Sequence, residues 1–195
     1  VCHNTYKNTS GEWVYPDDVK FENSKLVQIS KKLEVTEGPI ESMSKSKKNV
    51  IDPQSIIANY GADSARWFML SDSPPERDIN WSESGIQGSW KFCQKIWTLV
   101  DQNKHIFKKN SQVSDYSEET KGFIGQIHEQ LDVITRSIEK FQMNVAVAKI
   151  YEMVNLISKF KCDQEEKEGA LRESLIILIR VIEPMIPHLA EECWE

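Results

Sequence analysis

One short polar stretch carries the residue types that could do chemistry. It brings three lysines and three serines together without an acidic residue, in the order Ser42-Met43-Ser44-Lys45-Ser46-Lys47-Lys48-Asn49. Lysine side chains bind phosphate as compact point charges, and serine hydroxyls and loop N–H groups add directed hydrogen-bond donors. The stretch therefore predicts a mobile phosphate-binding loop. A solvated basic turn explains the same composition equally well, because runs of charge usually face solvent.

The whole chain has the composition of a globular protein with an acidic balance. Its 195 residues suffice for one or two domains, and its formal net charge is −6. That charge excludes nucleic-acid binding by the chain as a whole, so local basic patches must carry any such role. No apolar run approaches the ~20 residues that cross a bilayer, and no signal peptide is visible, so no membrane contact is expected. Reduced cysteines fit a cytoplasmic protein. The first methionine is Met43 and the last residues fit an interrupted helix, so we expect a piece of a longer protein.

No other group of residues forms a convincing catalytic or metal site. The four cysteines are scattered, without a C-x-x-C pair or a histidine at ligand spacing, so no metal is expected. Cys93 and Cys193 fall on apolar helix faces and are predicted to be packed thiols. Arg66 is interpreted as a surface or ion-paired residue, and His188 as a packed or surface one.

The elements around the basic stretch change from extended to helical along the chain. Residues 1–41 show short apolar–polar alternations between glycines and prolines, which predict small strands and loops. Residues 42–81 hold the basic stretch and two short helices, the first capped by Asp52 and ended by Gly61. From 82 to 195, apolar residues recur at spacings of three and four, which predicts an antiparallel bundle of four or five helices. The expected fold is therefore mainly α, with a small strand-and-loop appendage.

The first helix of the bundle has an apolar face and a basic one. The residues predicted to face the core are Ile86, Trp90, Cys93, Trp97 and Val100. The exposed positions carry five lysines and a single acid, namely Lys91, Lys95, Lys104, Lys108 and Lys109 against Asp101. A solubilising surface is the favoured explanation from composition alone. A stripe that follows a phosphate backbone is the alternative.

Several of these features coincide in one known family. The run from Met43 to Asn49, with Asp52-Pro53 and Tyr60-Gly61-Ala62-Asp63 after it, resembles the second signature of class I aminoacyl-tRNA synthetases and its usual sequel. The usual form of that signature is Lys-Met-Ser-Lys-Ser, and Ser42 replaces its first lysine here. Within the class, the stretch from Ser73 to Asp78 and the stretch from Trp81 to Gly88 are similar to those of leucyl enzymes.

The resemblance implies a domain arrangement. Residues 1–41 would be the strand-and-loop end of a Rossmann-like catalytic domain, and residues 42–81 the signature loop with the helices that follow it. Residues 82–195 would be an anticodon-binding-type helical bundle, truncated at its C-terminal end.

The resemblance also implies a reaction and its partners. The intact enzyme, expected to be a monomer, would activate leucine with ATP and transfer it to tRNA(Leu), whereas this piece alone would be inactive. The loop residues Met43, Ser44, Lys45, Ser46 and Lys47 would bind ATP. Lys45 would act in catalysis by stabilising the charge that develops on pyrophosphate. Mg²⁺ would accompany ATP and be bound mainly by residues outside this chain.

The bundle and its basic residues would serve tRNA binding. Lys48, Lys91 and Lys95 are the residues to which the resemblance gives this role. Two other functions remain open: a non-catalytic RNA-binding module, and a helical interaction protein whose basic loop is phosphorylated, which would cancel its local positive charge. The continuous match through Asp63 argues against both, because neither requires it.

Overall fold

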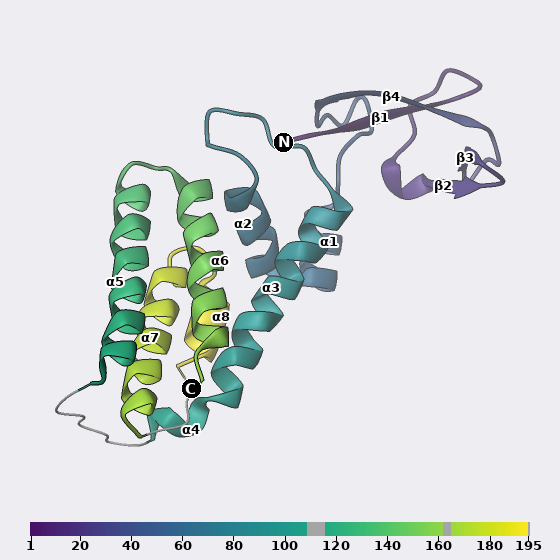
Figure 1. Ribbon diagram of the computed structural model, residues 1–195. Coiled ribbons are helices and arrows are strands. Elements are labelled where there is room, and N and C mark those ends of the chain that lie inside the picture. The colour runs from purple at the N-terminus through teal and green to yellow at the C-terminus, as the bar shows by residue number, and fades with distance from the viewer. Residues whose placement is uncertain (109–115, 162–164, 195) are drawn as a thin grey trace. The chain divides into compact units, whose positions relative to one another are not determined.

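The computed structural model describes residues 1–108, 116–161 and 165–194, and the chain divides into two compact units. The strand unit comprises Val1–Asn59 and Arg77–Gly85, and the helical unit comprises Tyr60–Glu76 and Ile86–Glu195. Figure 1 shows the elements of both units. The division into 1–41, 42–81 and 82–195 stays a prediction about domain roles.

The strand unit is built on two antiparallel strand pairs. β1 (Cys2–Asn8) pairs with β4 (Val35–Ser42), and their register places Cys2 opposite Ser42. A short 3-10 helix, Pro16–Asp18, leads into the hairpin of β2 (Val19–Glu22) and β3 (Lys25–Gln28). The hairpin turn is Asn23-Ser24, with φ values of 49° and 62°, as the two-residue turns that match strand twist require. Helix α1 (Pro53–Tyr60) follows the basic loop.

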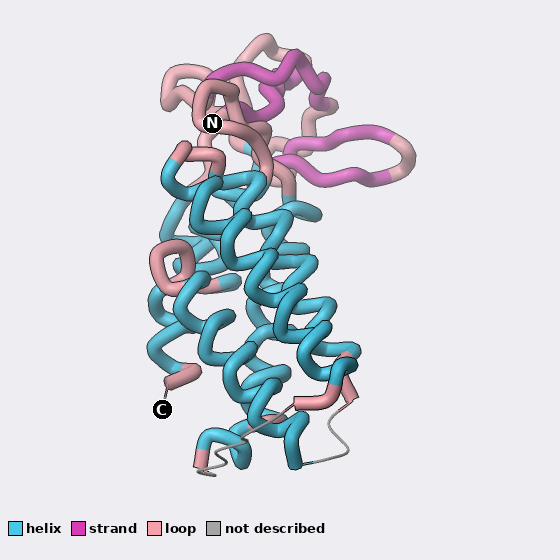
Figure 2. Tube along the Cα trace, turned by 60° about the vertical axis from the view of Figure 1, so that its left-hand side comes forward, coloured by secondary structure: helices cyan, strands magenta, loops and turns pink. Residues whose placement is uncertain are grey.

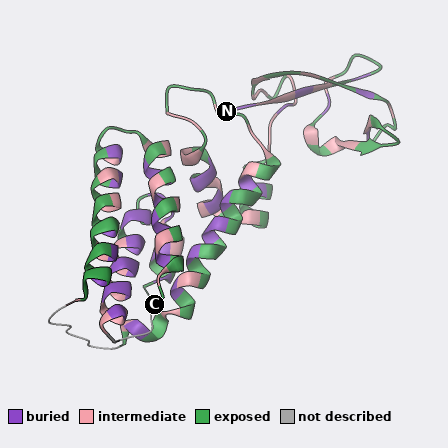
Figure 3. Cartoon of the chain, in the orientation of Figure 1, coloured by how far each residue is buried: buried purple, intermediate pink, exposed green. Residues whose placement is uncertain are grey.

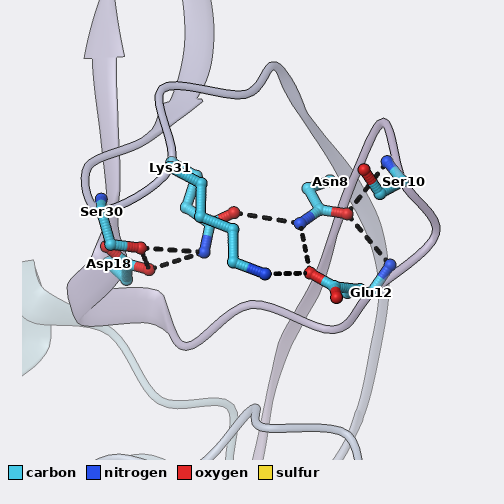
Figure 4. Close-up of polar contacts among 7 residues, drawn as sticks. Asn8, Ser10, Glu12, Asp18, Ser30 and Lys31 are labelled. Carbon is cyan, nitrogen blue, oxygen red and sulfur yellow. Dashed lines mark hydrogen bonds and ion pairs between the residues drawn. The ribbon is translucent and has the colours of Figure 1, made fainter.

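A polar network fixes the loops of the strand unit against β1 (Figure 4). The side-chain amide of Asn8, which is buried, donates to Glu12 at 3.1 Å and to Gln28 at 3.0 Å. Lys31 donates to the same Glu12 carboxylate, and this hydrogen bond is the largest cause that lowers the pKa of Glu12. Gln28 donates onward to Asp18 at 2.8 Å. The network joins β1, the loop after it and the hairpin into one platform.

The helical unit is a bundle whose longest helices run side by side (Figures 1 and 2). α5, α6 and α7 pack against one another, and α2 packs against α6 and α8. The helices are α2 (Ala62–Ser71), α3 (Glu83–Gln102), α4 (Lys104–Phe107), α5 (Glu118–Glu139), α6 (Met143–Lys159), α7 (Glu165–Ile182) and α8 (Pro187–Glu192). The mainly α fold with a strand appendage is thus confirmed. Across the described residues, no helix has the length and apolar character needed to span a membrane.

The predicted helix signals around α1 are also confirmed. The Asp52 carboxylate accepts from the backbone N–H groups of Gln54 and Ser55, at 3.2 and 3.3 Å, and so caps the helix that starts at Pro53. Gly61 follows the helix with a φ of 82°, a conformation that favours glycine.

Buried apolar residues line the sides of α5, α6 and α7 that face one another (Figure 3). Where α2 and α3 meet this core, the Trp67 ring stacks on Phe92 at 5.1 Å, and its Nε1 donates to the hydroxyl of Tyr151 at 3.1 Å. Cys93 and Cys193 are buried in the same core, as predicted, and burial raises the pKa of each thiol to about 11. Both thiols are therefore protonated at neutral pH and serve as packing groups.

The predicted core face of α3 is partly wrong. Ile86, Cys93 and Val100 are buried as predicted, but Trp90 and Trp97 are 36% and 39% exposed. Their places in the core are taken by Phe92 and Ile96, which are buried. The physical reason is that Phe92 packs against Trp67 of α2 and Tyr151 of α6, and these neighbours fix which side of α3 faces inward.

Two residues of α2 hold the turn between α7 and α8. Arg66 Nε donates to the carbonyl of Met185 at 2.8 Å, and its Nη2 donates to that of Pro184 at 3.1 Å. Asp63 accepts from the backbone N–H of Leu189 at 2.7 Å. Arg66 is an exposed surface residue, as predicted, and its guanidinium binds two carbonyl groups in the turn after α7 rather than an acidic partner. We call these contacts of Asp63 and Arg66 the α2 clasp.

Candidate active-site loop

The basic stretch forms a loop that leaves the end of β4. Ser42, the last strand residue, pairs with Cys2, and the backbone N–H of Met43 still donates to the carbonyl of Val1 at 3.0 Å. A turn then forms in which Lys48 N–H donates to the carbonyl of Lys45 at 3.3 Å. Lys48 itself has a φ of 54°, in the left-handed region that closes the turn. The loop therefore begins on a paired strand and returns to it within a few residues.

Asn49 fixes the base of this loop. Its side chain is fully buried, and its Oδ1 accepts from the backbone N–H of Ser44 at 2.8 Å. Its Nδ2 lies 3.1, 3.3 and 3.4 Å from the carbonyl oxygens of Glu41, His3 and Ser42. One amide thus satisfies backbone groups on both β1 and β4. Sequence reasoning gave Asn49 no role, although it is the one amide side chain in a run of lysines and serines.

The three lysines of the loop have different environments. Lys47 forms an ion pair with Glu41 of β4, so its charge is already compensated. Lys48 places its Nζ 5.5 Å from the centre of the Tyr15 ring, within the range of a cation–π contact. The side chain of Lys45 is exposed and has no hydrogen bond or ion pair with any described residue. Lys45 is thus the loop cation that is most available to an incoming anion.

Ser44 and Ser46 flank Lys45 in the chain. The hydroxyls of Ser44 and Ser46 are 2.7 Å apart, so one donates to the other and the second hydroxyl proton stays available. Ser42 is exposed at the strand end, where the signature's first lysine would stand, and its Oγ lies 3.8 Å from the Cys2 sulfur. The group of donors around Lys45 suits an anion such as phosphate. Within the described part of the chain, no group of three His, Cys, Asp or Glu side chains could hold a metal ion.

The bundle lysines lie in the helical unit and are treated separately from the loop. Lys91 and Lys95 both occupy exposed positions on α3. Lys95 donates to Asn155 of α6 at 2.7 Å, a neutral partner that leaves its positive charge uncompensated. Lys104 pairs with Asp101 at 2.7 Å. Lys109, the last member of the predicted basic face, lies outside the described residues.

Comparisons with known proteins identify the two parts of the chain. Residues 34–82 match the family described as tRNA synthetases class I (I, L, M and V), and residues 120–195 match the anticodon-binding domain of tRNA ligase. All of the chain matches the leucine–tRNA ligase of Parvibaculum lavamentivorans at 42% identity over 201 residues, and that of Afipia carboxidovorans at 43% over 206. The chain spans 23% of the length of each of these relatives.

Two solved structures share the fold. The leucyl enzyme of Agrobacterium radiobacter K84, in a ternary complex with tRNA and LeuAMS, matches 78% of this chain and 20% of its own with a TM-score of 0.70 at 27% identity. The methionyl-tRNA synthetase of Mycobacterium tuberculosis, bound by methionyl-adenylate, matches 100% of this chain and 70% of its own with a TM-score of 0.66. At 10% identity the second match speaks for the fold alone.

The signature loop on its strand platform, followed by the helical bundle, places the chain in the class I aminoacyl-tRNA synthetases. Within this class, it belongs to the leucine–tRNA ligases, which match it over its whole length. The resemblance expected from the sequence is therefore confirmed at both levels.

Proposed function

We propose that this chain is the part of a leucine–tRNA ligase that supplies the ATP-binding loop and a tRNA-binding bundle. The observation that carries the proposal is the free, exposed ammonium of Lys45 on a loop whose base is fixed by Asn49. The whole enzyme, a cytoplasmic monomer, would activate leucine with ATP and Mg²⁺ and then charge tRNA(Leu). The chain alone would be inactive, because the leucine pocket and the Mg²⁺ ligands would lie elsewhere in the enzyme.

In this reaction, the leucine carboxylate attacks the α-phosphate of ATP and pyrophosphate leaves. Negative charge grows on the leaving pyrophosphate, so a cation placed beside it lowers the barrier. Lys45 has the freedom to provide that cation, whereas the Lys47 ammonium is held by Glu41. Met43, Ser44, Ser46 and Lys47 would shape the loop around the phosphates. The loop would close over ATP and open again for product release.

The proposal extends to tRNA binding by lysines of both units. Lys91 and Lys95 are exposed on α3, and Lys48 adds a cation in the loop. Each would contact a phosphate of the tRNA backbone, and such contacts strengthen binding without reading the sequence. Added salt would therefore weaken the binding of tRNA by these lysines.

The test is ATP–pyrophosphate exchange by the whole protein that contains this chain, with leucine, isoleucine and valine compared side by side. We expect exchange with leucine, and a loss of about 10²- to 10³-fold for Lys45→Ala, the effect of removing one transition-state donor. Lys25→Ala is the matched control, because Lys25 is an exposed lysine of the same unit that pairs with Glu34.

Each other outcome assigns a different function. Exchange with isoleucine or valine would keep the mechanism and overturn the leucine specificity. A Lys45→Ala variant with normal exchange would remove Lys45 from catalysis. No exchange with any of the three amino acids would favour an RNA-binding module, in which Lys45→Ala lowers RNA affinity only slightly.

A further inference from the structure

A pocket of about 490 Å³ lies between α5 and α7 of the helical unit, at some distance in sequence from the loop and the α3 lysines. We call it the α5–α7 pocket. Its walls combine apolar side chains with two arginines, and they include Tyr116, His128, Leu131, Arg172, Ile176 and Arg180. A pocket of this composition can take a ligand that has both an anionic and a flat apolar part.

The side chains of the two arginines have no partner in the part of the chain that the structure describes. Neither guanidinium forms an ion pair or hydrogen bond with any described residue. The Arg172 Nε is buried and has no hydrogen-bond partner in the described part of the chain. A buried donor without a partner costs about 1–3 kcal/mol, so the fold tolerates an unsatisfied Nε–H group at this place. An anion in the pocket would satisfy it.

The acidic groups near the pocket already have partners. Glu173 lies on the pocket wall, and its Oε1 is 2.8 Å from His128 Nε2 of α5. Glu166, one turn before the pocket on α7, accepts from both the backbone N–H and the hydroxyl of Ser117. Both carboxylates thus have hydrogen-bond partners, whereas the guanidinium groups of Arg172 and Arg180 have none among the described residues.

We propose that the α5–α7 pocket binds a backbone phosphate of the tRNA, with Arg172 and Arg180 as its ligands. The planar guanidinium donates two parallel hydrogen bonds to phosphate oxygens, a geometry that a lysine ammonium does not offer. The Tyr116 ring on the same wall provides a face on which an adjoining ribose or base can lie. The inference rests on the proposed function, since it takes the bundle as a tRNA-binding module and adds a second contact surface to that of α3.

The experiment measures the affinity of the whole protein for tRNA(Leu) over a series of salt concentrations. For Arg172→Lys with Arg180→Ala, we expect about a tenfold or larger loss of affinity at low salt. The slope of log affinity against log salt should become shallower by about one for each phosphate that the variant no longer binds. The Lys keeps the charge and the aliphatic stem at position 172, and Arg180 is exposed, so the variant should fold. Arg136→Ala is the matched control, because this exposed α5 arginine pairs with Asp132.

A second measurement separates this inference from the proposed function. Leucine-dependent ATP–pyrophosphate exchange without tRNA should be equal in the variant, the control and the unchanged protein. If exchange is normal and the variant binds tRNA with the affinity and salt slope of the control, the phosphate site is wrong while the proposed function stands. If the unchanged protein shows no exchange but the variant still loses affinity and slope, the site stands and the ligase proposal fails.

Discussion

The loop depends on two residues with opposite environments. The ammonium group of Lys45 is exposed and has no partner among the described residues, so it can bind an incoming anion. Asn49 is fully buried and satisfies backbone groups that the turn would otherwise leave unpaired. The Asn49 side chain therefore holds the loop in its shape, and Lys45 supplies its positive charge. A change at either residue should impair the loop, but only a change at Asn49 should also destabilise the fold.

Replacement of Asn49 by Ala tests this division. The variant leaves the N–H of Ser44 and the carbonyl of Glu41 without their partner, and each unsatisfied buried group costs about 1–3 kcal/mol. We expect the free energy of unfolding to fall by about 2–3 kcal/mol, measured by urea denaturation. Asn59→Ala, at an exposed position of α1, should change it by less than about 0.5 kcal/mol. Equal stability of the two variants would contradict the role of Asn49.

The sequence could show Lys45 but not the role of Asn49. The lysine belongs to a local pattern of charge, and such a pattern is visible in eight consecutive residues. The contacts of Asn49 include the carbonyl of His3, which is 46 positions away in the chain. Only the pairing of β1 with β4 brings these groups together, and that pairing has no short-range signal.

Among the elements, α3 has two candidate core faces, and packing selects one of them. The spacing of four and three runs through Trp90 and Trp97, but Phe92 and Ile96 lie on an adjoining arc of the same helix. Periodicity alone does not choose between arcs that are both apolar. The rings of Trp67 and Tyr151 pack on Phe92, and these contacts determine which arc of α3 faces the core. The existence of the helix was thus predictable from its sequence, and its orientation was not.

The orientation of α3 gives a second prediction. Ile96→Ala removes a fully buried side chain and should lower the free energy of unfolding by about 2–5 kcal/mol. Trp97→Ala removes a larger side chain, but one that is 39% exposed, so it leaves no closed cavity and should cost less than Ile96→Ala. Chemical denaturation of both variants gives the comparison. A larger loss for the tryptophan would mean that the sequence-based face is the correct one.

On the scale of the whole molecule, contacts far apart in the sequence determine how the bundle closes. The bonds of Arg66 to Met185 and Pro184 span 119 and 118 positions, and that of Asp63 to Leu189 spans 126. Arg66 binds two carbonyl groups of the turn after α7, and Asp63 binds an N–H group in the first turn of α8, which the helix cannot satisfy by itself. The antiparallel bundle was predictable from helical periodicity, whereas this closure by α2 was not, since no local pattern marks it.

The α2 clasp should therefore be a cooperative structural contact. Arg66→Ala leaves two carbonyl groups without their charged donor, and hydrogen bonds to charged groups contribute about 1.5–3 kcal/mol. We expect a loss of about 2–3 kcal/mol for Arg66→Ala and a smaller one for Arg66→Lys, which keeps a single donor group. The solvent-exposed pair of Arg136 with Asp132 is the reference, and Arg136→Ala should cost about 0.5 kcal/mol or less.

A double-mutant cycle of Arg66→Ala with Asp63→Asn shows whether the two residues act through one turn. Arg66 contacts the turn before α8, and Asp63 contacts the first turn of α8. Once the first substitution has released this segment, the second substitution should therefore cause a smaller loss of stability. The combined loss in the free energy of unfolding should then fall short of the sum of the single losses by about 0.5 kcal/mol or more. Strict additivity would mean that α7 and α8 are held independently. In that case the contacts of Arg66 and Asp63 would stabilise the bundle independently of each other.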